Sequence, residues 1–123
     1  MYKLQVQRDF IAQHYLTVPN CGDENEWHSH HFRVDVLLEG RALNKNGYLV
    51  DITEVENALD TLVDRFRDAT LNDLPEFKGL NPSIEHFSRI FTEALEDQMP
   101  SDQVETLTVR IWEDEDAWAS YST

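Results

Sequence analysis

The segment from residue 28 to residue 38 alternates with a period of two, and the face that holds its apolar residues begins with two histidines. The residues that share this face are His28, His30, Phe32, Val34, Val36 and Leu38. Successive side chains of a β-strand point to opposite faces of the sheet, so this period predicts a strand with one buried face. His31 falls on the other face. The pattern therefore predicts a strand whose buried face begins with two imidazoles.

An earlier segment has the same period and supplies a third imidazole. Leu4, Val6, Phe10 and Ala12 alternate with other residues, and a strand that continues without a bulge brings His14 to the same face. Residues 17–27, which follow it, contain Pro, Gly, Asn and Asp, the residues typical of turns. They predict a loop that connects two neighbouring strands.

Three histidines on the shared face of two neighbouring strands predict a metal site. Three imidazoles without a fourth protein ligand are typical of catalytic zinc, which keeps one position for water or substrate. Structural zinc sites usually close with cysteines, and Cys21 is the only cysteine. We therefore expect His14, His28 and His30 to bind one Zn²⁺ in a site with an open coordination position. The alternative is that they are ordinary surface or packing histidines.

Two segments in the middle of the chain predict helices. The first begins at Asp51 or Thr53, each followed three residues later by Glu, and runs to about residue 68. The second follows Ser83, which can cap a helix, and ends before Pro100. Each has one apolar stripe. The stripes are Val55, Leu59, Leu62 and Phe66 in the first helix, and Ile84, Phe87, Phe91 and Leu95 in the second.

Three further segments predict strands. They are residues 48–50, after a turn at residues 44–47; residues 107–111; and residues 117–121, after an acidic turn that begins at Glu113. The main elements follow the order β-β-α-α-β-β, an α+β fold in a single domain over residues 1–123. Strands joined by short turns pair antiparallel, so we expect an antiparallel sheet with both helices on one face.

The charge of the chain excludes two classes of partner. It has 24 acidic and 10 basic residues, a formal net charge of −14. Such a chain repels nucleic-acid phosphates and anionic membrane surfaces, so we expect neither as a partner. One cysteine permits no intrachain disulfide, and no apolar run has the form of a signal peptide or a membrane span. We expect a reducing, cytoplasmic setting.

Six short motifs, in order along the chain, resemble those of a known enzyme family. They are Phe10-Ile11-Ala12-Gln13-His14; Cys21 followed by His28-Ser29-His30-His31-Phe32; Gly47-Tyr48-Leu49-Val50-Asp51-Ile52; Leu71-Asn72-Asp73; Asn81-Pro82-Ser83-Ile84-Glu85-His86; and Trp112-Glu113. They are similar to the motifs of the 6-pyruvoyltetrahydropterin synthase and 6-carboxytetrahydropterin synthase family. The resemblance implies the tunnelling fold, in which neighbouring copies join edge to edge into a barrel as a homotrimer, and two trimers stack into a hexamer.

The resemblance also implies a function. It implies a zinc-dependent lyase that acts on a reduced pterin such as 7,8-dihydroneopterin triphosphate, with Cys21 as general base. Glu113 would anchor the pterin ring, helped by Ser83 and Glu85. The residues themselves support Glu113, because a carboxylate on the apolar face of a strand needs a partner and adjacent N–H groups of a pterin can donate two hydrogen bonds to it. The alternative is that Glu113 only begins the acidic turn.

The chain departs from the family motifs at its acid–base residues. Residues 22–27 separate Cys21 from His28, which is a longer spacing than usual, and Arg67-Asp68 stand where the family has an Asp-His pair. Glu24 and Glu26 are therefore candidate replacement bases, of which we favour Glu26. Two alternatives remain open: an activity like that of dihydroneopterin aldolase with a loop Glu as base, and a non-catalytic zinc protein that binds a pterin or purine.

Overall fold

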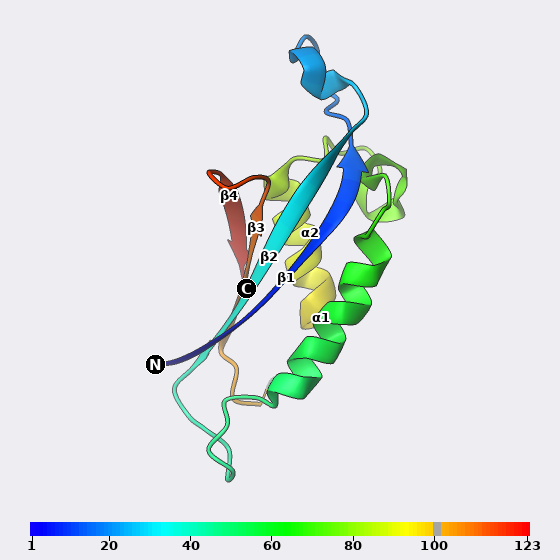
Figure 1. Cartoon of the computed structure of the whole chain (residues 1–123). Coiled ribbons are helices and arrows are strands. Elements are labelled where there is room, and N and C mark those ends of the chain that lie inside the picture. Colours follow the sequence, from blue (N-terminus) through cyan, green and yellow to red (C-terminus); the bar gives the residue numbers. More distant parts are fainter. Residues whose placement is uncertain (100–101) are drawn as a thin grey trace.

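A computed structural model describes residues 1–99 and 102–123 and contains the six predicted main elements in the predicted order (Figure 1). The strands and helices are β1 (Tyr2–His14), β2 (His28–Gly40), α1 (Ile52–Phe66), α2 (Ile84–Glu96), β3 (Thr106–Trp112) and β4 (Trp118–Ser122). Three short 3₁₀ helices lie in the connections: η1 (Gly22–Asn25), η2 (Leu71–Asp73) and η3 (Pro75–Phe77). Pro100, which we expected to follow the second helix, lies outside the described residues.

The four strands form one antiparallel sheet in the order β1-β2-β3-β4. β1 and β2 pair along their whole length without a bulge, from Tyr2 opposite Gly40 to His14 opposite His28. β3 is shorter and ends opposite Arg33, with Trp112 as its partner. The first residues of β2 therefore extend beyond β3, which leaves one side of β2 uncovered where the histidines lie.

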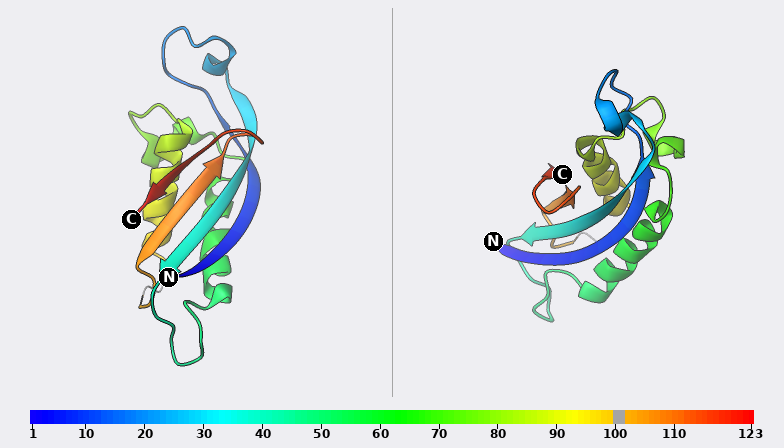
Figure 2. Two further views of the ribbon diagram at one scale, coloured as in Figure 1. Left: turned by 90° about the vertical axis from the view of Figure 1, so that its left-hand side faces the viewer. Right: turned by 45° about the horizontal axis from the view of Figure 1, so that its top comes forward.

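Both helices cover the same face of the sheet, as predicted (Figure 2, left view). α1 packs on β1, and α2 packs on β3 and β4. From Val6 onward, the even-numbered apolar residues of β1 and β2 and the odd-numbered ones of β3 are buried in the core beneath the helices. Burial of these side chains supplies most of the favourable free energy of folding. The core therefore fixes which face of β1 and β2 carries each histidine.

Each helix begins at a side-chain cap that the sequence predicts. The Asp51 carboxylate accepts a hydrogen bond from the Thr53 N–H, and the Ser83 hydroxyl accepts one from the His86 N–H. Asp51, rather than Thr53, is thus the cap of α1. α1 ends at Phe66, slightly before the predicted end, because Arg67 leaves the helical conformation.

The prediction of a short strand at residues 48–50 is wrong. The turn before it is present, since Asn44 N donates to Tyr48 O and Gly47 N donates to Asn44 O. However, β1 and β3 already occupy the two sides of β2, so no edge is free beside β2 for the returning segment. Leu49 is instead buried beside Gly40. A side chain at position 40 would collide with Leu49 and with the carbonyl oxygen of Gln103.

The loop between β1 and β2 extends beyond the end of the sheet, and η1 lies near its tip (Figure 1). Residues 41–51 form the connection at the opposite end. In the part of the chain that the structure describes, no helix has the length and apolar character needed to cross a membrane.

Candidate metal centre

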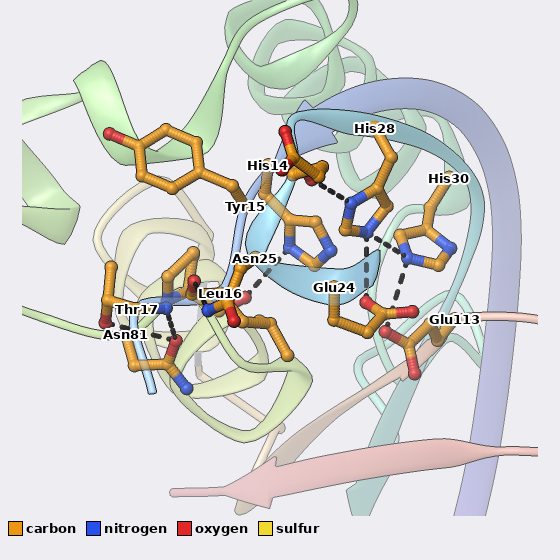
Figure 3. Close-up of polar contacts among 12 residues, drawn as sticks. His14, Tyr15, Leu16, Thr17, Glu24, Asn25, His28, His30, Asn81 and Glu113 are labelled. Carbon is orange, nitrogen blue, oxygen red and sulfur yellow. Dashed lines mark hydrogen bonds and ion pairs between the residues drawn. The ribbon is translucent and has the colours of Figure 1, made fainter. Parts of the chain in front are cut away.

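Three imidazoles meet at the end of the sheet where β1 finishes and β2 begins (Figure 3). His14 is the last residue of β1 and pairs with His28, the first residue of β2, while His30 lies two residues further on the same face. The ring centroids of the three pairs are 4.6, 4.7 and 4.9 Å apart. His31 points to the opposite face, where its Nε2 lies 3.4 Å from the Asp9 carboxylate. The unbulged register thus brings together the three histidines that the alternation predicted.

A fourth side chain joins them from the loop. Glu24, in η1, places Oε2 3.1 Å from His28 Nε2. One ligand atom from each of His14, Glu24, His28 and His30 lies within 4.8 Å of every other, a group that could hold a metal ion. We refer to these four residues as the His-Glu cluster. Sequence reasoning named Glu24 only as a candidate base.

Main-chain carbonyl groups fix the orientation of two of the rings. His14 Nδ1 lies 3.0 Å from Pro82 O, and His28 Nδ1 lies 2.6 Å from Glu26 O. A carbonyl oxygen can only accept, so Nδ1 carries the proton in both rings and the neutral tautomer leaves Nε2 as a lone pair. Both histidines therefore direct Nε2 into the cluster, which is how a second shell prepares imidazoles to bind a metal.

Two buried atoms of the cluster lack a hydrogen-bond partner, and a bound cation could take that place. Among the described residues, His14 Nε2 and Glu24 Oε2 are buried without a hydrogen-bond partner. His14 is 1% exposed, and burial, reinforced by His30 and His28, lowers its pKa to about 4. The ring is therefore neutral at pH 7, the form that binds metals. Buried lone pairs without donors are costly, and a cation between these atoms would satisfy both. The residues fit a metal ion.

The loop that carries Glu24 is held by asparagine side chains. Asn25 accepts from Cys21 N and donates to Leu16 O and Val18 O. Leu16 N in turn donates to Glu24 O across 2.7 Å. Asn81, which precedes α2, accepts from the N–H and the hydroxyl of Thr17. The backbone at Glu24 is thus fixed from both sides (Figure 3).

The two bases that the sequence favoured lie outside the His-Glu cluster. Cys21 is half-buried at the start of η1, and its sulfur is not among the clustered ligand atoms. The Glu26 side chain is exposed, and Glu26 contributes its main-chain carbonyl to His28. Extended backbone at Glu26, after η1, turns its side chain to solvent. The structure therefore brings Glu24 to the position that we assigned to Glu26.

A cavity of about 580 Å³ lies at the uncovered side of β2, where His31, Arg33 and Trp112 of the helix-free face line it and His30 joins it to the cluster. His30 and Glu113 line it, and His30 Nε2 lies 3.5 Å from Glu113 Oε1. Burial raises the pKa of Glu113; His30 opposes this shift, and the Glu24 carboxylate adds to it. A volume of this size suits a small organic ligand. Glu113 is thus a carboxylate in a cavity wall, which can accept N–H groups of a ligand.

Asp35 lies on the face of β2 that carries no helix, yet it is buried. It is 3% exposed, accepts a hydrogen bond from Trp112 Nε1 at 2.8 Å and pairs with Arg33 Nε at 3.0 Å. Arg33 and Trp112 both line the cavity. Trp112 comes from the neighbouring strand β3, and alternation along β2 alone does not reveal this contact. Asp35 therefore holds the cavity wall in place.

Comparison with known proteins identifies the family. Residues 3–123 match the family model described as 6-pyruvoyl tetrahydropterin synthase. The chain belongs to this family. Its membership supports a tetrahydropterin synthase-type function and a lyase-type enzyme.

Solved structures of this family share the fold. The 6-pyruvoyl tetrahydropterin synthase of Caenorhabditis elegans is 19% identical and superimposes with a TM-score of 0.85, over 99% of this chain and 95% of that chain. The Plasmodium vivax enzyme is 13% identical, with a TM-score of 0.84 over 99% and 97% of the two chains. An uncharacterized protein of Wolinella succinogenes is 18% identical, with a TM-score of 0.74 over 98% and 97%. The chain fold that the motifs implied, the four-stranded antiparallel sheet with two helices of the tunnelling fold, is therefore confirmed.

The remaining family positions lie apart from the cavity in this chain. The Ser83 hydroxyl is occupied as the cap of α2, and Glu85 is exposed in the first turn of that helix. Arg67, at the position of the family's Asp-His pair, lies 3.4 Å from Asp64 one turn earlier. Neither Ser83 nor Glu85 lines the cavity beside Glu113. The supporting roles of Ser83 and Glu85 therefore stay predictions.

Proposed function

We propose that the protein is a zinc-dependent lyase that acts on a reduced pterin of the 7,8-dihydroneopterin triphosphate type. The observation that carries this proposal is the convergence of His14, Glu24, His28 and His30 beside a cavity that Glu113 lines. Family membership supplies the class of reaction. The three histidines supply the metal ligands, Glu24 supplies a carboxylate beside them, and Glu113 supplies an acceptor for the ring.

The donor set favours zinc. Imidazole nitrogens with one carboxylate oxygen form a common zinc environment, whereas Mg²⁺ and Ca²⁺ prefer oxygen ligands. His14, His28 and His30 would hold the ion, with Pro82 O and Glu26 O orienting two of the rings. When bound, zinc acts as a Lewis acid and makes side-chain hydroxyl groups of a pterin more acidic.

Glu113 would orient the pterin by its ring. The 2-amino group and the adjacent ring N–H of a pterin can donate two parallel hydrogen bonds to one carboxylate. Such donors favour the ionised form and so offset the cost of burying it. Glu113 Oε1 lies 3.5 Å from His30 Nε2, so a ring held at Glu113 keeps its side chain near the His-Glu cluster.

Glu24 would be the base. Two solved structures of the Plasmodium vivax synthase carry substitutions of a catalytic residue that is a glutamate, which supports a catalytic glutamate in this chain. Here Glu24, and not Glu26 or Cys21, lies in the cluster. Glu24 would take a proton from a side-chain carbon of the pterin. The electron pair left behind would form a carbon–carbon double bond as triphosphate leaves with the electrons of its C–O bond.

Product analysis tests this proposal. The zinc-loaded protein is incubated with 7,8-dihydroneopterin triphosphate, and the products are identified by mass. Triphosphate release by wild type and loss of that release in His30→Ala are expected. An aldehyde fragment that keeps the triphosphate would show aldol cleavage instead, and tight binding without turnover would show a binding protein. Either result would overturn the synthase assignment.

A matched pair of variants tests the base. Glu24→Gln and Glu26→Gln remove the same charge from the same loop, and both keep the main-chain carbonyl of residue 26. A positioned general base typically contributes about 10²–10⁴ in rate, so Glu24→Gln should lose roughly that factor while Glu26→Gln stays near wild type. The reverse result would return the role to Glu26, and loss in Cys21→Ala alone would return it to the thiol.

We also infer that several copies assemble through the edges of the sheet. Among the described residues, no strand pairs with the outer side of β4, and Trp118 and Tyr121 on this strand are exposed. An open edge invites pairing with another chain. Joining this edge to β1 of the next copy would close a barrel as a trimer, and two trimers could stack as a hexamer.

A further inference from the structure

We propose that Glu24 is a fourth ligand of the metal ion, so that the site at rest is closed by a carboxylate which the substrate displaces. This inference rests on the metal centre of the proposed function and changes its resting state. The three histidines by themselves predict an open position. The loop between β1 and β2 places Glu24 Oε2 at that position.

Two distances within the His-Glu cluster are close to those expected around a four-coordinate ion. Ligand atoms about 2.0–2.1 Å from zinc in a tetrahedral arrangement lie roughly 3.3 Å from one another. Glu24 Oε2 lies 3.1 Å from His28 Nε2, and His28 Nε2 lies 3.0 Å from His30 Nε2. The carboxylate oxygen is therefore as close to His28 Nε2 as the Nε2 atom of His30 is.

An ordinary ion pair between Glu24 and His28 explains less. It would give Glu24 Oε2 a partner, but His14 Nε2 would remain buried and without one. A cation bound by all four residues satisfies both atoms at once. The Glu24 side chain as a whole is 47% exposed, yet Oε2 is buried. Glu24 thus directs Oε2 into the cluster, while other parts of its side chain are exposed to solvent.

The loop holds Glu24 in this place before any ligand arrives. Asn25 bonds to three main-chain groups of the loop, and Asn81 fixes Thr17. Release of the carboxylate from the metal therefore needs only rotation of the Glu24 side chain, while the backbone stays in place and the three histidines keep the ion. The same rotation would free a coordination position for a substrate oxygen and would free the carboxylate to accept a proton. The two roles of Glu24 would follow one another in time.

Cobalt substitution tests the ligand role without measuring activity. Co²⁺ replaces zinc in such sites, and its visible absorption reports coordination number and ligand type. The protein is stripped with a chelator and reloaded with Co²⁺, and the spectrum and metal affinity of wild type, Glu24→Gln and Glu26→Gln are compared. X-ray absorption of the zinc forms counts the light-atom ligands. Circular dichroism verifies that each variant is folded.

We expect Glu24→Gln to change the cobalt spectrum and to weaken metal binding by at least about tenfold, since even second-shell changes cost 10–100-fold. Glu26→Gln should keep the wild-type spectrum and affinity. A dihydropterin with side-chain hydroxyls should shift the wild-type spectrum as it displaces the carboxylate.

The outcomes separate this inference from the proposed function. If Glu24→Gln keeps the wild-type spectrum and affinity while His28→Ala loses the metal, the carboxylate is not a ligand and the three-histidine centre stands. If wild type and His28→Ala bind Co²⁺ equally weakly, the metal centre itself fails, and the Glu24 ligand fails with it.

Discussion

His14 donates its Nδ1 proton to the carbonyl oxygen of Pro82 across 3.0 Å. This bond joins the end of β1 to the residue before the cap of α2, and it leaves His14 Nε2 as a buried lone pair. A single main-chain carbonyl thus decides both where the ring points and which nitrogen can bind a metal. The site depends on the sheet and on the helical layer together.

The buried ring should make the metal-free protein sensitive to mild acid. The pKa of His14 is lowered from 6.5 to about 4 in the folded chain. Between these values the unfolded chain binds a proton at this residue and the folded chain does not, so stability falls as the pH falls through this window. Between pH 7.5 and pH 5 this difference in proton binding at His14 should lower the free energy of unfolding by about 2 kcal/mol.

Urea unfolding of chelator-treated protein at these two pH values measures this effect. In His14→Gln the loss of unfolding free energy between them should be smaller than in wild type by about that amount. His31→Gln removes an exposed imidazole from the other face and should retain the wild-type loss. Equal pH dependence in wild type and His14→Gln would contradict the assignment.

Strand parity predicts which histidine variants lose the metal. His28→Ala removes a member of the His-Glu cluster, whereas His31→Ala removes a ring that points to the opposite face. We expect close to one zinc per chain in wild type and in His31→Ala, and little in His28→Ala. Elemental analysis after dialysis gives the contents. Equal metal in the two variants would show that the site lies elsewhere.

Recognition of the ring should depend on Glu113 more than on the acidic residues after it. Glu113→Gln replaces one acceptor oxygen by a donor that faces the donors of a pterin. Loss of a hydrogen bond to a charged group costs about 2–3 kcal/mol, and calorimetry with a dihydropterin should show a weakening of this size. Glu115→Gln removes the same charge from another cavity-lining residue of the turn and should change affinity little. Equal losses would reduce Glu113 to a turn residue.

The outer edge of β4 offers a specific test of assembly. Glu113 N donates to Ala117 O and Thr123 N donates to Leu107 O, so the odd-numbered residues of β4 bond to β3 and the N–H of Ser120 points outward. Ser120→Pro removes that N–H without breaking the pairing with β3.

Light scattering at micromolar concentration should give wild type at least three times the 14.4 kDa of one chain. Ser120→Pro should shift the mass toward one chain, whereas Ser120→Ala should not. A wild-type mass of one chain would contradict assembly through the sheet.

The strands and the three histidines could be predicted because one rule governs both. Alternation over β1 and β2 determines the buried face, and His14, His28 and His30 simply continue it. Glu24 belongs to a loop, where no period relates sequence to direction. Its place depends on Asn25 and Asn81, and the bond from Asn81 spans a long stretch of chain. The sequence therefore predicted the imidazoles and could not choose between Glu24 and Glu26.

Two features of the fold could not be predicted for a similar reason. Residues 48–50 have the composition of a strand, but pairing needs a free edge, and the neighbours of β2 were not visible in the sequence. Asp35 lies on the face without helices, yet Trp112 and Arg33 cover it. The missing free edge and the contact from Trp112 both depend on segments that are distant along the chain.

Because β1 pairs continuously with β2, the candidate metal centre depends on the number of residues between the core positions of β1 and His14. Val6 and Phe10 anchor β1 in the core, and the number of residues from them to His14 decides the face on which that ring emerges. One residue inserted between Phe10 and His14 would turn the imidazole toward solvent and away from Pro82, although every ligand would still be encoded. Two inserted residues would restore its face but move it beyond His28. In this stretch an alignment gap is therefore more informative about metal binding than most substitutions.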